Sequence, residues 1–251
     1  MKRICLALAI LTADLLASPA TGAEFDSNGI KLHYTIEGKG EPVVLIHGLH
    51  SSAQLNWQLP GITTALAKDH QVIALDCRGH GQSGKPTADE QYGEAMAEDV
   101  VRLLDHLKLQ QAHVIGYSMG GMVTLKLLVK HPERVKSAVL GGMGWLKTGG
   151  VLQQTWERMP GREGAAVPPA CVRGLGRLAV TETELKAVRV PVTVIVGERD
   201  PVRRLYVEPL QGARPDWPVR IIAGAGHLNC IAKPEFQAEL RKALGSGAGS
   251  R

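Results

Sequence analysis

Short apolar runs rich in Val and Ile recur along the chain and alternate with longer stretches of helical period. Such runs are typical of strands buried on both faces of a parallel sheet whose faces are covered by the helices between them. The runs interpreted as strands are 43–46, 72–75, 113–117, 138–140, 192–196 and 219–222, and an earlier run, 30–37, alternates apolar and polar residues as an antiparallel strand would. The alternation predicts an α/β fold, a mostly parallel central sheet with helices on both faces.

Three helices are expected, over about 91–107, over 118–130 and over 234–244. In the first, Met96, Val100 and Leu103 fall on one apolar stripe. Pro132 follows the second, and Pro234 stands in the first turn of the third, where proline is well tolerated.

The segment 145–187 interrupts this alternation, because it contains no strand pattern and is rich in Gly, Pro and Arg. An insertion of about 40 residues is longer than a plain connection between two elements. We interpret it as a small, mostly helical lid over the carboxyl edge of the sheet, inserted after the sixth strand. The core then comprises 24–144 and 188–244, and the Gly- and Ser-rich run 245–251 is expected to be a flexible tail. The lid residues expected to contact the substrate are Trp145, Trp156, Leu175 and Leu178.

The first 23 residues have the layout of a secretory signal. Lys2 and Arg3 precede an apolar stretch, 4–17, and the segment ends with the small residues Thr21-Gly22-Ala23. This layout predicts a secreted or periplasmic protein, and a buried N-terminal helix is the alternative. After signal removal, no stretch is long and apolar enough to predict a stable membrane span.

Charge and cysteine content narrow the possible partners. The formal net charge is +5, but the basic residues are scattered, which argues against a nucleic-acid site. Cys77, Cys171 and Cys230 have no zinc-site spacing, so no metal is expected. Three reduced thiols is the interpretation we favour, and one disulfide beside one free thiol is the alternative.

The run Gly116–Gly120 reads GYSMG and stands between a predicted strand and a predicted helix. A Gly-x-Ser-x-Gly run in this setting is typical of a nucleophile elbow, in which the glycines relieve crowding at a tight turn. Ser118 would then lie at the helix N-terminus, where the helix dipole and free amides favour developing negative charge. The pattern predicts Ser118 as a nucleophile rather than as an ordinary turn residue.

A serine hydroxyl needs a general base, and in this arrangement the acid and then the histidine follow it along the chain. Asp200 follows the strand 192–196, and His227 lies in a Gly-rich loop after the strand 219–222. These positions predict His227 as the base and Asp200 as the acid that orients it. Glu198 is the rival acid, placed second because Asp200 adjoins Pro201, where the next helix should begin. The alternatives are that Asp200 is an ordinary turn residue before Pro201 and that His227 is a loop or core histidine.

A developing oxyanion needs two backbone donors. The Met119 amide directly follows the nucleophile, and the Leu49 amide lies in the loop after the strand 43–46. His47 is expected to orient that loop rather than to act on substrate. The run 79–84 fits G-x-G-x-x-G, but a loop rather than a helix follows it, so no dinucleotide cofactor is expected.

Together these segments resemble the α/β-hydrolase superfamily. The resemblance rests on His47-Gly48, the run 76–83 of the form D-x-R-G-H-G-x-S, the run 116–120, Asp200 and His227. It implies the same triad, a lid between the sixth and seventh strands, and a structural role for the 76–83 loop. Haloalkane dehalogenases and epoxide hydrolases of this fold carry Asp at the elbow, unlike this chain. Gly48-Leu49-His50 also departs from the Gly-Gly-Pro-Gly run of proline iminopeptidases.

The function expected from these residues is that of a serine hydrolase. It would cleave a small-to-medium, largely apolar carboxylic ester or lactone through an acyl-enzyme. A carbon–carbon bond hydrolase or a cofactor-free perhydrolase could use the same triad, and a non-catalytic ligand-binding module is a further alternative. The expected partner is a small-molecule substrate, and no cofactor is expected.

Overall fold

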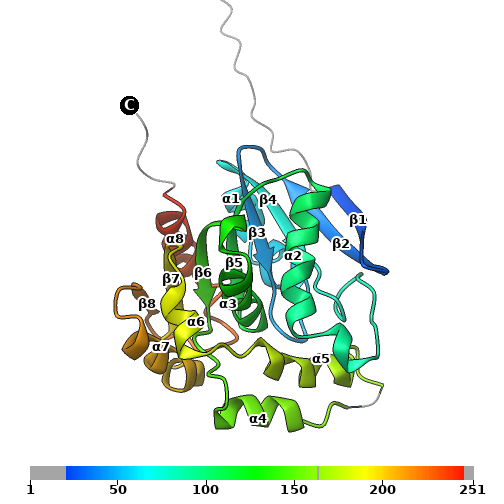
Figure 1. The fold of residues 1–251 in the computed structure, drawn as a ribbon. Helices are drawn as coiled ribbons and strands as arrows, with labels where there is room; N and C mark the ends of the chain where they lie inside the picture. Colours follow the sequence, from blue (N-terminus) through cyan, green and yellow to red (C-terminus); the bar gives the residue numbers. More distant parts are fainter. Residues whose placement is uncertain (1–20, 163, 246–251) are drawn as a thin grey trace, which may run out of the picture.

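A computed structural model of the chain describes residues 21–162 and 164–245. The expected signal segment lies outside these residues except for 21–23, and the expected tail lies outside except for Gly245. Within the described residues the sheet has eight strands in the order β1-β2-β4-β3-β5-β6-β7-β8 (Figure 1). Their bounds are β1 Thr21–Ser27, β2 Ile30–Glu37, β3 Glu41–Ile46, β4 His70–Leu75, β5 Ala112–Tyr117, β6 Val135–Gly141, β7 Val192–Gly197 and β8 Val219–Ile222.

Strands β3 to β8 pair in parallel, whereas β1 and β2 run antiparallel to their neighbours. The prediction of a mostly parallel sheet with helices on both faces is confirmed, and β2 has the expected bounds. Strand β1 was not expected, because its first residues had been assigned to the end of the signal segment. In the structure Thr21 pairs with Ile36 of β2, so backbone pairing rather than side-chain pattern defines this strand.

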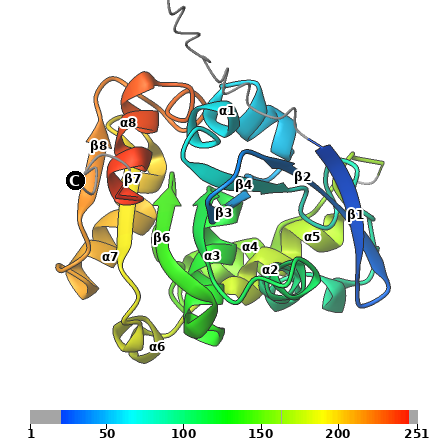
Figure 2. The same cartoon turned by 90° about the horizontal axis from the view of Figure 1, so that it is seen from above.

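Helices cover the two faces of the sheet and create two apolar cores (Figure 2). Helices α2 (Glu94–His106) and α3 (Met119–Lys130) cover one face, and α1 (Ile62–Leu66) and α8 (Pro234–Ala243) cover the other. In β3, Val44 and Ile46 belong to the first core, while Val43 and Leu45 belong to the second. A strand buried on both faces has no polar side to show, which explains its continuous apolar run.

In the described part of the chain, five further short helical elements lie outside the insertion after β6. They are η1 (Gln54–Gln58), η2 (Asp89–Gln91), η3 (Pro132–Arg134), η5 (Arg203–Val207) and α7 (Glu208–Ala213). No helix in the described ranges is long and apolar enough to cross a membrane.

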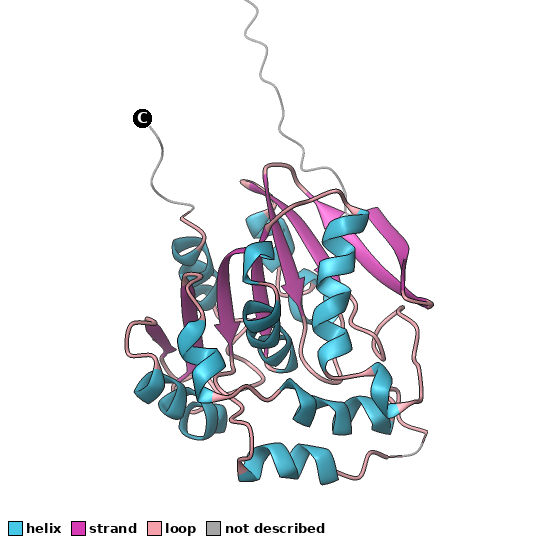
Figure 3. Cartoon of the chain, viewed as in Figure 1, coloured by secondary structure: helices cyan, strands magenta, loops and turns pink. Residues whose placement is uncertain are grey.

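The insertion after β6 is helical, as expected (Figure 3). It contains α4 (Val151–Arg158), α5 (Pro169–Gly174), η4 (Leu175–Leu178) and α6 (Glu182–Ala187). Helices α4 and α5 lie beyond the ends toward which the β3, β5 and β6 arrows point in Figure 1. The insertion therefore adjoins the carboxyl edge of the sheet, where the loops of an α/β domain form its site.

Candidate active site

The turn between β5 and α3 holds Ser118 in an unusual backbone conformation. Its φ is 53° and its ψ is −116°, and its amide donates to the Gly141 carbonyl oxygen at 2.8 Å. A side-chain Cβ at Gly116 would lie 2.0 Å from the Gly120 oxygen, and one at Gly120 would lie 2.0 Å from the Ile46 oxygen. Only glycine fits those two positions, so the sharp turn that presents Ser118 depends on them.

Ser118, His227 and Asp200 form a continuous hydrogen-bonded chain. His227 Nε2 lies 2.9 Å from Ser118 Oγ, and His227 Nδ1 lies 2.8 Å from Asp200 Oδ2. The Asp200 side chain is fully buried, while that of His227 is 29% exposed. Because an ionised carboxylate only accepts, Nδ1 carries the hydrogen and Nε2 is free to accept the serine proton. The structure thus brings together the three residues that the sequence pattern selected, in the geometry that acyl transfer requires.

Glu198, the rival acid, has a different partner. Its Oε2 accepts a hydrogen bond from the Gly224 amide at 2.8 Å. It therefore braces the loop that leads to His227, and Asp200 is the acid that contacts the imidazole.

The two amides expected to bind an oxyanion are available as donors. Met119 is the first residue of α3, where an amide has no acceptor within the helix. Within the described ranges, the Leu49 amide donates no hydrogen bond. A Cβ at Gly48 would lie 3.3 Å from Ser118 Cβ, so this loop passes directly beside the nucleophile. Both amides can therefore donate hydrogen bonds to negative charge that develops beside Ser118.

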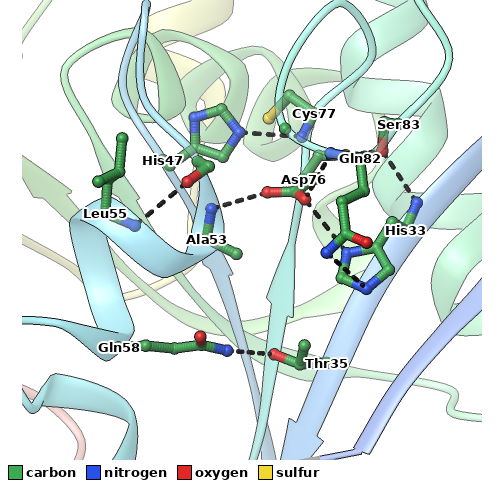
Figure 4. Close-up of polar contacts among 12 residues, drawn as sticks. His33, Thr35, His47, Ala53, Leu55, Gln58, Asp76, Cys77, Gln82 and Ser83 are labelled. Carbon is green, nitrogen blue, oxygen red and sulfur yellow. Dashed lines mark hydrogen bonds and ion pairs between the residues drawn. The ribbon is translucent and has the colours of Figure 1, made fainter.

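His47 fixes the loop after β3 that contains Gly48 and Leu49, which we call the oxyanion loop. Its Nε2 accepts a hydrogen bond from the Cys77 amide at 3.0 Å (Figure 4). Its Nδ1 therefore carries the hydrogen and donates to the Gly48 carbonyl oxygen at 2.8 Å. Complete burial lowers the pKa of His47, which keeps the ring neutral. The Gly48 amide in turn donates to Asn56 Oδ1 at 2.7 Å. His47 is thus an orienting residue, as expected from the sequence.

Asp76 ties neighbouring loops together beneath this site (Figure 4). Its Oδ1 accepts the Ala53 amide at 2.8 Å, and its Oδ2 accepts the Gln82 amide at 3.0 Å. Gly81 has a φ of +49°, and a Cβ there would lie 2.3 Å from the Asp76 carboxylate. The Gly-rich run 79–84 therefore wraps around a buried carboxylate, which is the structural role that the resemblance implied.

A pocket of about 270 Å³ opens above Ser118. Its lining combines the oxyanion loop with the nucleophile turn and the histidine loop: Gly48, Leu49, His50, Ser51, Asn56, Tyr117, Ser118, His227, Leu228 and Ile231. Leu228, 90% exposed, lies at its edge. The cavity is small for a ligand site.

The four lid residues do not line this pocket, so their assignment as substrate contacts is corrected. Trp145, Leu175 and Leu178 are at most 5% exposed and belong to the apolar core. Trp156 is half-buried, and its indole N–H donates to the Tyr206 hydroxyl at 3.1 Å. Their apolar character serves to pack the insertion onto the core, because a surface insertion needs an apolar face of its own.

Sequence reasoning missed several residues that line the pocket. Asn56 and Tyr117 both line the pocket. Asn56 follows the oxyanion loop in a short helical turn, and Tyr117 fills a variable position of the pentapeptide, so neither carried a signal. The cysteines Cys77, Cys171 and Cys230 are free thiols and buried, as the favoured interpretation predicted.

A family model described as alpha/beta hydrolase fold matches residues 41–178, more than half of the chain. The chain belongs to the α/β hydrolase family. Over 128 residues this α/β hydrolase is 40% identical to a 2-hydroxymuconate semialdehyde hydrolase of Pseudomonas sp. (strain CF600), a match that covers 50% of this chain and 44% of that relative. The chain spans less than half the length of the curated relatives it matches.

Solved structures resemble this α/β hydrolase over most of its length. The 2-hydroxy-6-oxo-6-phenylhexa-2,4-dienoate hydrolase of Rhodococcus sp. strain RHA1 has a TM-score of 0.72 at 20% identity, covering 91% of this chain and 99% of its own. Epoxide hydrolase VrEH1 of Vigna radiata has a TM-score of 0.74 at 18% identity, covering 90% of this chain and 98% of its own. At these identities the likeness shows the fold alone, and function must be argued from the site.

Proposed function

We propose that this α/β hydrolase is a serine hydrolase that cleaves a small-to-medium, largely apolar carboxylic ester or lactone through an acyl-enzyme. The observation that carries the proposal is the hydrogen-bonded chain from Ser118 through His227 to Asp200, with distances of 2.9 and 2.8 Å. A serine hydroxyl gains nucleophilic strength only beside such a base.

The reaction follows from the positions of these groups. Ser118 Oγ attacks the carbonyl carbon while His227 Nε2 accepts its proton, and the buried Asp200 carboxylate stabilises the imidazolium. The oxyanion binds to the Leu49 and Met119 amides. His227 then protonates the leaving alcohol, and a water molecule activated by the same nitrogen hydrolyses the acyl-enzyme.

Hydrolysis of p-nitrophenyl esters of graded acyl length tests this proposal. We expect Ser118→Ala to lower kcat by roughly 10⁴-fold or more, because the nucleophile is lost. Ser137→Ala is the matched control, since this serine lies on β6, bonds His113 of β5 and is outside the pocket. Short acyl chains should be preferred, because the pocket is small. Ester turnover that survives in Ser118→Ala would overturn the proposal, and a wild-type protein that neither turns over esters nor labels with a fluorophosphonate would favour a ligand-binding role.

A second candidate is carbon–carbon bond hydrolysis on the same triad. It is favoured by the 40% identity to a protein named 2-hydroxymuconate semialdehyde hydrolase. Turnover of 2-hydroxymuconate semialdehyde far above that of any ester would replace the first proposal with the second. Peracid formation far above ester cleavage would favour a perhydrolase instead.

We propose in addition that the protein is exported and that its leader is cleaved after Ala23. Cleavage there would remove the first three positions of β1 and leave Glu24–Ser27 paired with β2. N-terminal sequencing of the protein from its native host tests this. A mature chain that still begins at Met1 would overturn it.

A further inference from the structure

Tyr117 lies beneath the catalytic histidine, wedged between two elements of the core. It is 3% exposed, and its ring meets that of Phe236 edge-on with centroids 5.8 Å apart. A Cβ at Gly141 or Gly142 would lie 2.9 Å from the Tyr117 ring. Glycine at the end of β6 thus leaves space for this side chain, and the ring is held in place by close packing.

The Tyr117 hydroxyl reaches across the site to the histidine loop. It donates a hydrogen bond to the backbone carbonyl oxygen of His227, 110 residues further along the chain. The two rings also lie 5.6 Å apart. Burial raises the pKa of Tyr117, so the hydroxyl keeps its proton and stays a donor at neutral pH.

The backbone hydrogen bonds that hold the loop of His227 fall on the residues beside the histidine. The loop contains Gly224 and Gly226, and Leu228 beyond the histidine is 90% exposed. Its other backbone hydrogen bonds hold flanking residues. The Gly224 and Gly226 amides donate to the Glu198 and Asn229 side chains, the Arg199 amide donates to the Ala225 oxygen at 2.8 Å, and the Cys230 amide donates to the Gly226 oxygen at 3.1 Å. The Tyr117 hydroxyl is bonded to the backbone of the histidine itself, so it restrains the residue whose imidazole must lie between Ser118 and Asp200.

We propose that Tyr117 is a positioning residue for His227, fixing the backbone of the base through its hydroxyl so that the imidazole contacts Ser118 and Asp200 at once. This inference rests on the proposed function for its effect on turnover. Its effect on the histidine geometry can be measured without any substrate.

The test is Tyr117→Phe, which removes one oxygen and keeps the ring. We expect kcat on the preferred ester to fall by about 10- to 100-fold with KM within about twofold, because a small displacement of the base disturbs a geometry needed only for reaction. We also expect the proton NMR resonance of His227 Nδ1–H, which reports its bond to Asp200, to shift or broaden.

Tyr92→Phe is the matched control. The Tyr92 hydroxyl also donates to a backbone carbonyl, that of Pro86 at 2.6 Å, and Tyr92 is 1% exposed. It does not line the pocket above Ser118. Both variants should lose similar stability in urea unfolding, and only Tyr117→Phe should change kcat and the resonance.

The outcomes separate the two proposals. An inactive wild type that fails to label at Ser118 would overturn the proposed function, and the resonance comparison would still test the role of Tyr117. Wild-type kcat and an unchanged resonance in Tyr117→Phe would overturn that role. So would a Tyr117→Phe protein that fails to fold while Tyr92→Phe folds, since the hydroxyl would then be a general structural requirement.

Discussion

Two groups of loops meet at Ser118, and they are built in different ways. The loops after β3 and β4 are linked by buried polar side chains, with His47 at 0% exposure and Asp76 at 3%. The loop after β8 carries His227, whose side chain is 29% exposed, beside the still more exposed Leu228. One side of the site is therefore a buried polar network, and the other is a loop whose residues His227 and Leu228 are open to solvent.

This difference agrees with the roles proposed for the two sides, oxyanion binding on one and general-base catalysis on the other. Backbone donors for an oxyanion are most effective when they are fixed in advance and need no reorganisation. A general base must exchange protons in turn with the serine, the leaving group and water, which requires access from solvent. Segments with few buried contacts are also those that open most readily. The contrast predicts that substitutions on the two sides will act on different quantities.

The largest effect is expected at the base, in Asp200→Asn. The amide cannot hold the Nδ1–H tautomer of His227 as the carboxylate does, so kcat should fall by roughly 10⁴-fold with little loss of stability. Glu198→Gln is the control, and it should stay within about threefold of wild type because Glu198 bonds Gly224 instead. Steady-state kinetics on the preferred ester measure both. Equal losses in the two variants would show that Glu198 shares the role of the acid.

On the network side, Asp76→Asn should act mainly on stability. The new amide group would face the amide hydrogens of Ala53 and Gln82, so a buried donor would be left without an acceptor. We expect the free energy of unfolding to fall by about 2–3 kcal/mol in urea titrations. Asp69→Asn, at an exposed position, should change it by less than about 0.5 kcal/mol. Equal stability of the two variants would contradict the view of Asp76 as a structural hub.

The buried polar network should also make the stability of the protein depend on pH. Burial, and then the neighbouring His47, lower the pKa of His80 to about 3 from its usual value of 6.5. Between these values the unfolded chain binds the proton and the folded chain does not, so stability is complete above about pH 6.5 and is lost as the pH falls. His80 should contribute a loss of about 2 kcal/mol between pH 7 and pH 5.

Urea unfolding of His80→Asn at both pH values checks this contribution. On acidification the variant should lose less unfolding free energy than wild type. The loss that remains should be due partly to His47. His50→Asn, at an exposed position, should behave like wild type. If the pH dependence of stability in His80→Asn matched that of wild type, His80 would not contribute to it.

The smallest effect is expected at the exposed edge, in Leu228→Ala. Since Leu228 is 90% exposed, the free energy of unfolding should change by less than about 0.5 kcal/mol. Leu228 also lines the pocket, so KM for the longer apolar esters should rise by a few fold while kcat is kept. Ile222→Ala serves as the buried contrast, and its free energy of unfolding should fall by about 2–5 kcal/mol. A large loss of stability in Leu228→Ala would mean that the histidine loop is packed more firmly than its exposure indicates.

Much of the fold was predictable because its signals are local. Strands buried on both faces leave continuous apolar runs, as in Val43–Ile46, and the period of α2 and α3 separates them from those runs. The strand β1 and the short helix α1 were missed, because β1 depends on pairing with β2 and α1 is only five residues long. The lid residues were assigned wrongly because an apolar pattern does not tell whether a residue faces a substrate or the core.

The sequence by itself determined the elbow and the order of the triad. Gly116 and Gly120 are dictated by contacts within one tight turn, and Asp200 and His227 each follow a recognisable strand. The tertiary structure alone decided that Trp145 packs in the core and that the Tyr117 hydroxyl holds the His227 backbone. These last contacts join distant parts of the chain, so they depend on how the helices and strands pack and leave no trace in local spacing.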